Sequence, residues 1–155
     1  FIRKNLMCCD QLRLPEQKAY FPRIKIELLT IAIPRIKILD LLQLNTYWQN
    51  HLTLEALTML IANSQCFLAT QGETIIGFAR VLSDGDNFAS LWDVVVDKKY
   101  QGQGIGKNMI HHIFIHTLYN NIKKWLLFTD TAHKLYRRFG FAMVSESANH
   151  MITMI

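Results

Sequence analysis

Three glycines alternate with other residues in the segment Gln101-Gly102-Gln103-Gly104-Ile105-Gly106-Lys107. The segment follows the apolar run Val94–Val96 and precedes a stretch with helical periodicity, so it joins a strand to a helix. Because glycine has no side chain, a ligand can approach the backbone closely there, and the first free N–H groups of the helix favour a phosphate. Lys107 adds positive charge. These residues predict a site for a diphosphate group.

The glycine spacing argues against the two common nucleotide-binding loops. A Rossmann loop needs a third glycine where Lys107 stands. A phosphate loop of the ATPase type needs one more residue between Gly102 and Gly106, and Ser or Thr where Asn108 stands. A tight turn without a ligand is the remaining alternative.

A second motif, Ala132-His133-Lys134-Leu135-Tyr136-Arg137-Arg138-Phe139-Gly140-Phe141, follows about thirty residues later. With Gln101-x-x-Gly104-x-Gly106 it resembles the acetyl-coenzyme A loop and the Tyr-bearing helix with its Gly-Phe turn of the GNAT superfamily of N-acetyltransferases. Gly77-Phe78-Ala79-Arg80, Ser83-Asp84 and Leu91–Asp97 resemble more narrowly the plastid-encoded red-algal acetyltransferases and the serotonin N-acetyltransferase-like proteins of plants and cyanobacteria. The resemblance extends from about Gln65 to Val144.

This resemblance implies acetyl-coenzyme A as co-substrate, no metal, and a role for each matching residue. Strand backbone would pair with the pantetheine arm and loop amides would hold the pyrophosphate, which assigns cofactor binding to Val94, Val95, Val96, Gln101, Gly102, Gln103, Gly104, Ile105, Gly106 and Lys107. Tyr136 would lie near the thioester sulfur, and Trp92 and Asp93 would border the acceptor amine, with Phe88 as a further aromatic residue for the substrate.

The sequence departs from related patterns at two places. The branch usually has an Asp-Asn pair before the Tyr helix, whereas here Thr131 follows Asp130. A histone-type acetyltransferase would have Glu six residues before Val96, where this chain has Ser90.

Acetyl transfer from a thioester to an amine needs a neutral amine, a donor for the oxyanion, and a proton for the departing thiolate. An alkylamine has a pKa of about 10 and is protonated at pH 7, so a base must act directly or through water. Asp93 is the local candidate for this base, Tyr136 for the acid, and a strand amide near Val94 or Val95 for the oxyanion donor. The alternatives are a carboxylate that bonds nearby backbone and an aromatic side chain packed on the sheet.

The hydrophobic pattern predicts the elements that position these residues. Strands are expected over Ile24–Ile33, Gln65–Thr70, Thr74–Leu82, Phe88–Val96 and Lys124–Thr129. Helices are expected after Pro34, with Ile38, Leu41, Leu42 and Leu44 on one face, and over Leu54–Asn63, Gly104–Tyr119 and Thr131–Phe139. Because three strands follow one another, the order predicts the α/β class, with a central mixed sheet flanked by helices as in the GNAT acyltransferase fold.

The composition fits one globular domain. The chain has 155 residues, of which 50% are hydrophobic, and we expect a weakly determined extension over residues 1–20 and the GNAT domain over 21–155. No apolar run is long enough for a membrane helix, and three cysteines do not make a disulfide framework. The net charge of +5 combines an acidic middle with a basic C-terminal third, which suits an anionic cofactor and a cationic acceptor.

The predicted function is therefore acetyl transfer from acetyl-coenzyme A to a primary amine, either an arylalkylamine such as serotonin or a protein lysine or α-amine. A non-catalytic acyl-coenzyme A sensor and a basic RNA-binding module are the alternatives, although nucleic acid and membrane are not expected as partners and a homodimer is left open. The resemblance favours the plastid stroma as the location, with the cytoplasm as the alternative.

Overall fold

A single mixed β-sheet organises the protein. The computed structural model describes residues 6–9, 24–29 and 34–144, and for residues 6–9 the strand pairing alone. Within these residues, seven strands stand in the order β2-β3-β4-β5-β6-β1-β7. They are β1 (Leu6–Cys9), β2 (Ile24–Leu28), β3 (Gln65–Gln71), β4 (Thr74–Ser83), β5 (Phe88–Val96), β6 (Lys124–Phe128) and β7 (Ala142–Met143). All neighbouring pairs are antiparallel except β5 and β6, which run parallel.

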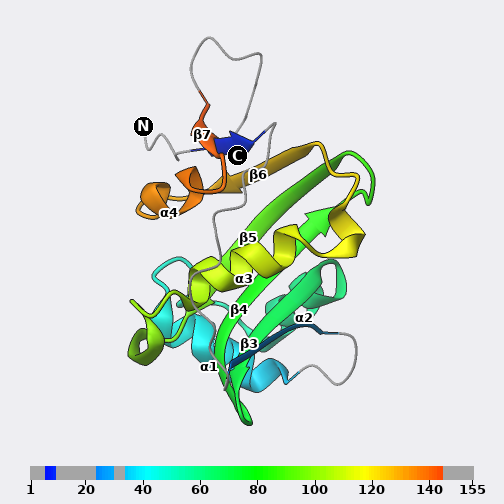
Figure 1. Ribbon diagram of the computed structural model, residues 1–155. Coiled ribbons are helices and arrows are strands. Elements are labelled where there is room, and N and C mark those ends of the chain that lie inside the picture. Colours follow the sequence, from blue (N-terminus) through cyan, green and yellow to red (C-terminus); the bar gives the residue numbers. More distant parts are fainter. Residues whose placement is uncertain (1–5, 10–23, 30–33, 145–155) are drawn as a thin grey trace.

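Helices cover both faces of the sheet (Figure 1). On one face, α1 (Arg35–Asn45) and α2 (Leu54–Ala62) pack on the sheet in a core that includes Leu42, Leu57 and Phe78. On the other face, α3 (Ile105–Phe114) and α4 (His133–Arg137) join a larger core that includes Phe67 and Met109. Successive strand residues point to opposite faces, so the central strands β3, β4 and β5 contribute to both cores.

A β-bulge interrupts β5 next to the glycine turn. Trp92 stands opposite Arg80 and Val95 stands opposite Phe78, so that Asp93 and Val94 together face the single residue Ala79. Asp93 adopts a positive φ of 48°, a backbone conformation that is uncommon for a residue other than glycine. A bulge of this kind re-aims side chains and increases the local twist of the strand.

Strands β5 and β6 separate beyond the middle of β5. Their parallel pairing begins at Phe88 opposite Lys124 and ends at Ser90 opposite Leu126, although β5 continues to Val96. Figure 1 shows the two strands diverging toward their C-terminal ends. Among the described residues, the Leu91–Val96 part of β5 therefore has no strand partner on this side.

The predicted fold class, a mixed α/β sheet flanked by helices, is confirmed. Most of the predicted element boundaries lie within one or two residues of the observed ones. The helix predicted over Gly104–Tyr119 is wrong beyond Phe114. The N–H of His116 bonds the carbonyl of Ile113, and the His116 ring nitrogen then accepts from the N–H of Leu118, which starts a separate 3₁₀ turn. The hydrogen bonding of His116 therefore ends the helix.

Three further differences concern the first third of the chain. The strand predicted over Ile24–Ile33 ends at Leu28, and residues 30–33 lie outside the described residues. Leu44, predicted for the buried face of its helix, is 71% exposed. No element was predicted within residues 1–20, yet β1 pairs there with β6 and β7. The division at residue 20 stays a prediction.

Candidate active site

The glycine turn between β5 and α3 forms an open backbone surface. Gly102 and Gly104 have φ angles of 76° and 86°, a region where other residues are strained, and a Cβ on either would have no protein atom within 4 Å. Glycine is needed here for its backbone conformation, and the space above the turn is free. The Gln101 side chain donates from Nε2 to the carbonyl of Val96 at 2.8 Å, which ties the turn to the end of β5.

Unused backbone donors gather on this turn. Gly104 is the N-cap residue of α3 and has no side chain that could accept from the first helical N–H groups. The first hydrogen bond of the helix runs from the N–H of Asn108 to the carbonyl of Gly104. In the described part of the chain, the N–H groups from Gly102 to Gly106 donate no hydrogen bond. Lys98 and Lys99, both exposed, lie in the preceding 3₁₀ turn. Free backbone donors, the positive end of a helix and nearby cations are features that favour an anion, as the sequence predicts for this turn.

The edge of β5 leads from this turn toward the middle of the sheet. Val94 and Val96 are half-buried and pack against the α3-side core, while Val95 points to the other face. Because β6 pairs with β5 only as far as Ser90, the backbone groups of β5 beyond this residue have no strand partner on this side in the described residues, and an extended group could pair with them. The ten residues predicted for cofactor binding thus lie on one continuous piece of backbone, from Val94 to Lys107.

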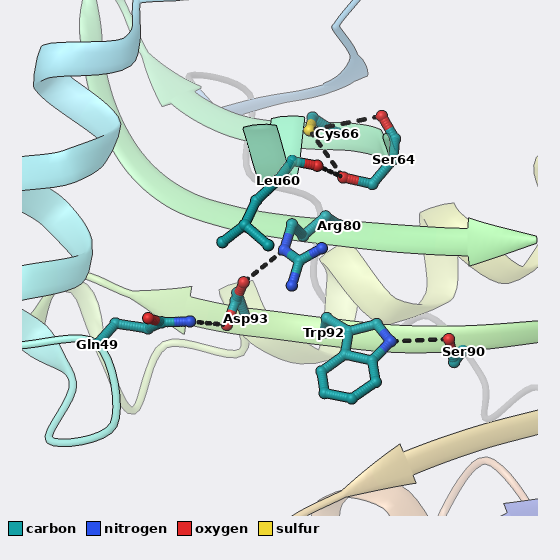
Figure 2. A network of polar contacts seen from close by, with 8 residues as sticks. All are labelled: Gln49, Leu60, Ser64, Cys66, Arg80, Ser90, Trp92 and Asp93. Atoms are coloured by element: carbon teal, nitrogen blue, oxygen red, sulfur yellow. Dashed lines mark hydrogen bonds and ion pairs between the residues drawn. The ribbon is translucent and has the colours of Figure 1, made fainter. Parts of the chain in front are cut away.

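Asp93 lies in a buried polar network at the bulge (Figure 2). Its Oδ2 accepts from Nε of Arg80, and its Oδ1 accepts from Nε2 of Gln49 at 2.9 Å. The side chains of Arg80 and Asp93 are only 6% and 4% exposed. Each oxygen thus already has a protein donor, and a protonated amine approaching Asp93 would compete with the guanidinium for the same carboxylate.

Trp92 and Phe88, both predicted to contact the acceptor, lie at different distances from Asp93. The Trp92 indole is half-buried, donates from Nε1 to the Ser90 hydroxyl at 2.7 Å, and lies beneath the Arg80 guanidinium. Phe88 begins β5, five residues before Asp93, which corresponds to about 16 Å along an extended strand. The structure therefore brings Trp92 next to Asp93 and leaves Phe88 at the far end of the strand.

Tyr136 is buried on α4. It is 7% exposed and meets Phe141 edge to face, with 5.9 Å between the ring centroids. Burial raises the pKa of its phenol well above the ordinary value, since ionisation would place a charge in an apolar environment. Burial thus favours the protonated phenol, which can donate a hydrogen bond.

The loop between α1 and α2 crosses from β5 to the end of β6, an arrangement that the sequence did not indicate. Gln49 of this loop donates to Asp93 on β5. The hydroxyl of Tyr47 donates to Oδ2 of Asp130 at 2.6 Å. At the start of the loop, Oδ1 of Asn45 accepts from the N–H of Lys98. Hydrogen bonding to the carboxylate raises the pKa of the exposed Tyr47 phenol. Partners up to 83 positions apart leave no local signal in the sequence.

No cluster of three His, Cys, Asp or Glu side chains suitable for a metal occurs in the described ranges. None of the helices seen in those ranges has the length and apolar character required to span a bilayer.

Curated relatives match about half of the chain. The histone acetyltransferase TAP1 of Glycine max is 40% identical over 78 residues, which are 50% of this chain and 34% of that protein. The chloroplastic GCN5-related N-acetyltransferase 2 of Arabidopsis thaliana is 37% identical over 52% of this chain and 32% of its own length. The N-acetyltransferase ycf52 of Gracilaria tenuistipitata is 40% identical over 43% of this chain and 37% of its own. The chain spans about a third of the length of these relatives.

Solved structures match over most of the fold. A GNAT-family protein from Xanthomonas campestris superposes with a TM-score of 0.77 at 26% identity, over 88% of this chain and 96% of that one. A GNAT acetyltransferase from Elizabethkingia anophelis with acetyl-CoA bound superposes with a TM-score of 0.60 at 22% identity, over 79% of this chain and 78% of that one, a likeness of fold.

The family described as the acetyltransferase (GNAT) domain matches residues 62–143, just over half of the chain. This range contains the bulged strand, the glycine turn, α3 and the Tyr136 helix. The relatives include the red-algal and chloroplast proteins that the sequence resemblance predicted. The chain belongs to the GNAT acetyltransferase family.

Proposed function

We propose that this protein transfers an acetyl group from acetyl-coenzyme A to a primary amine. One observation carries the proposal: the free N–H donors of the glycine turn lie at the end of the same β5 edge that β6 leaves unpaired. A diphosphate joined to an extended amide-bearing chain fits such a turn and edge, because the turn supplies anion donors and the edge supplies strand-like pairing.

The turn fits the pyrophosphate on steric grounds as well. The space above Gly102 and Gly104 is empty of protein atoms, and a side chain at either position would enter it. The pantetheine amides would pair with backbone from Val94 to Val96, which brings the thioester toward the bulge at Asp93. A protein with the same fold was solved with acetyl-CoA bound, which supports acetyl-coenzyme A as the ligand.

The proposed reaction is direct attack of the amine on the thioester carbonyl. Asp93 takes the amine proton, and a relay through water is the more accessible route because Arg80 and Gln49 occupy the carboxylate oxygens. The amine nitrogen then forms the new C–N bond, and a strand amide near Val94 or Val95 donates to the oxyanion. When the C–S bond breaks, its electron pair leaves with the sulfur as the coenzyme A thiolate, and Tyr136 acts as a donor to this thiolate.

The raised pKa of Tyr136 limits how this donation occurs. A phenol buried so deeply is a weaker acid than an ordinary thiol, so complete proton transfer in the empty site would be uphill. We therefore propose that Tyr136 donates a strong hydrogen bond to the developing thiolate. This hydrogen bond stabilises the negative charge that grows on the sulfur as the C–S bond breaks.

The acceptor is either a small arylalkylamine or a lysine or α-amine of a protein. The name of the soybean relative, a histone acetyltransferase, supports a protein acceptor, and the Trp92 ring, which directly precedes Asp93 on β5, supports an arylalkylamine. We propose the plastid as the location, on the support of the chloroplastic relative from Arabidopsis.

An acetylation assay on an amine panel tests the function. The purified chain is incubated with acetyl-coenzyme A and serotonin, tyramine, spermidine or lysine-bearing peptides, and products are identified by mass spectrometry. Acetylation of at least one amine, lost in the Gly104→Val variant, is expected. Tight binding of acetyl-coenzyme A in calorimetry without any acetylated amine would instead identify a sensor.

A further inference from the structure

A cavity lies between α2 and the sheet, beside the polar network of Asp93. Its volume is about 310 Å³, and it is lined by Met59, Leu60, Asn63, Arg80, Leu82 and Trp92. The first three come from α2 or its end, and the others from β4 and β5. Four of the six are apolar, and Arg80 is the only ion. The cavity therefore has room for a small, mostly apolar group.

Arg80 brings unused hydrogen-bond donors to this cavity. Of its five N–H groups, the one on Nε is bonded to Asp93, and the side chain is 6% exposed. Within the described ranges, Nη1 and Nη2 have no hydrogen-bond partner. Figure 2 shows the guanidinium between Asp93 and the Trp92 ring, with Leu60 across from it. Because Nη1 and Nη2 are not among the fully buried atoms of the described residues, they face the open cavity, where a ligand oxygen can accept from them.

The charges around Arg80 decide which ligand group suits it. Arg80 and Asp93 neutralise each other, and Arg80 is the one charged residue among the described residues that line the cavity. An ammonium group would be repelled by the guanidinium, and a carboxylate would be repelled by Asp93 nearby. A neutral oxygen, in a hydroxyl or carbonyl group, accepts from Nη without adding a charge to a low-dielectric site.

We propose that Arg80 determines acceptor specificity: the cavity holds the apolar tail of the acceptor amine, and Nη of Arg80 donates to a neutral oxygen on that tail. The inference rests on the proposed transferase function, because it takes the amine end of the same molecule to lie at Asp93. Trp92 lines the cavity and directly precedes Asp93, which makes the tail site and the reacting site continuous.

Amines that differ by one oxygen test the role of Arg80. Tyramine and phenethylamine share one carbon skeleton, and only tyramine has a ring oxygen. We expect kcat/KM for tyramine to exceed that for phenethylamine by about 10- to 100-fold, the range for a hydrogen bond to a charged group. In Arg80→Lys, which keeps a cation beside Asp93 but lacks the fork of donors, this ratio should fall to below about threefold. 1,4-Diaminobutane should be the poorest acceptor.

Filling the cavity provides a second test that does not depend on Arg80. Leu60→Phe places a larger side chain in the cavity, and Leu54→Phe makes the same change on an exposed part of α2 outside the lining. We expect Leu60→Phe to lower kcat/KM for tyramine at least tenfold, with Leu54→Phe unchanged. 4-Ethylphenol and ethylbenzene have no amine, so their binding, observed by ligand NMR, measures occupation of the cavity independently of acetyl transfer. Only 4-ethylphenol should bind wild type strongly, and Leu60→Phe should abolish its binding.

The outcomes separate the two proposals. Acetylation of tyramine and phenethylamine with equal kcat/KM, together with no preference for 4-ethylphenol, would overturn the role of Arg80 and leave the transferase function standing. Binding of 4-ethylphenol that is lost in Leu60→Phe, with no amine acetylated, would support the cavity and overturn the transferase function.

Discussion

Replacement of Gly104 by valine tests whether the glycine turn binds the cofactor, and Gly85 provides a matched control. Gly104 and Gly85 have φ angles of 86° and 83°, and a Cβ on either would have no protein atom within 4 Å. They lie beyond opposite ends of β5, with Gly85 in the turn that leads into the strand. The two variants should therefore share the backbone strain and differ only in their distance from the proposed phosphate site.

The expected magnitudes follow from this geometry. A valine held at positive φ costs about 1–3 kcal/mol, and at about 2–4 °C per kcal/mol for a chain of this size both variants should unfold roughly 2–12 °C lower than wild type. At Gly104 the side chain also enters the space above the free N–H groups. If it blocks two charge-assisted hydrogen bonds of about 1.5–3 kcal/mol each, the affinity for acetyl-coenzyme A falls about 100-fold or more.

Calorimetric titration with acetyl-coenzyme A gives the affinities, and thermal unfolding without ligand gives the stabilities. The expected pattern is similar loss of stability in both variants, with lost affinity in Gly104→Val alone. Wild-type affinity in a folded Gly104→Val would show that the pyrophosphate does not bind at this turn, and equal loss of affinity in Gly85→Val would mean that strain alone explains the effect.

Three further predictions concern side chains with defined environments. Tyr136→Phe should lower kcat about 100-fold while the acetyl-coenzyme A affinity changes less than about threefold, because proton donation matters in the transition state; an unchanged kcat in steady-state kinetics would remove Tyr136 from catalysis. Asp93→Asn leaves a buried guanidinium without its counterion, so the free energy of unfolding in denaturant titration should fall by about 3–5 kcal/mol. The same variant should shift the pH–rate profile, and an identical profile at saturating substrate would assign the base to another group. Asp84 accepts from the N–H groups of residues 86, 87 and 88, which lowers its pKa. Its stabilising effect is therefore present above the unfolded-state pKa and lost as pH falls through the lower folded-state pKa, so Asp84→Asn should reduce the difference in stability between pH 7 and pH 3; an unaltered difference would show that these bonds do not stabilise the fold.

The local pattern of residues was sufficient to predict the strand, glycine turn and helix from Phe88 onward. A strand of apolar and β-branched residues, glycines at positive φ and a helical periodicity are properties of neighbouring residues, and the sequence displays them directly. The same reasoning fails for the end of α3, because His116 meets Phe67 of a distant strand edge to face and caps a new turn. Leu44 was misassigned because periodicity does not reveal where the covered surface of a helix ends.

The sequence by itself determined the turn that presents backbone donors, the strand before it and the tyrosine helix after it, since each depends on residues close together in the chain. Only the tertiary structure decided the environment of Asp93, which contacts Arg80 and Gln49 from 13 and 44 positions away. It also decided the cavity beside Arg80 and the separation of β5 from β6. These features depend on which strands pair, where a bulge shifts their register, and which buried charges then meet, and such long-range contacts are set by the packing of the whole sheet.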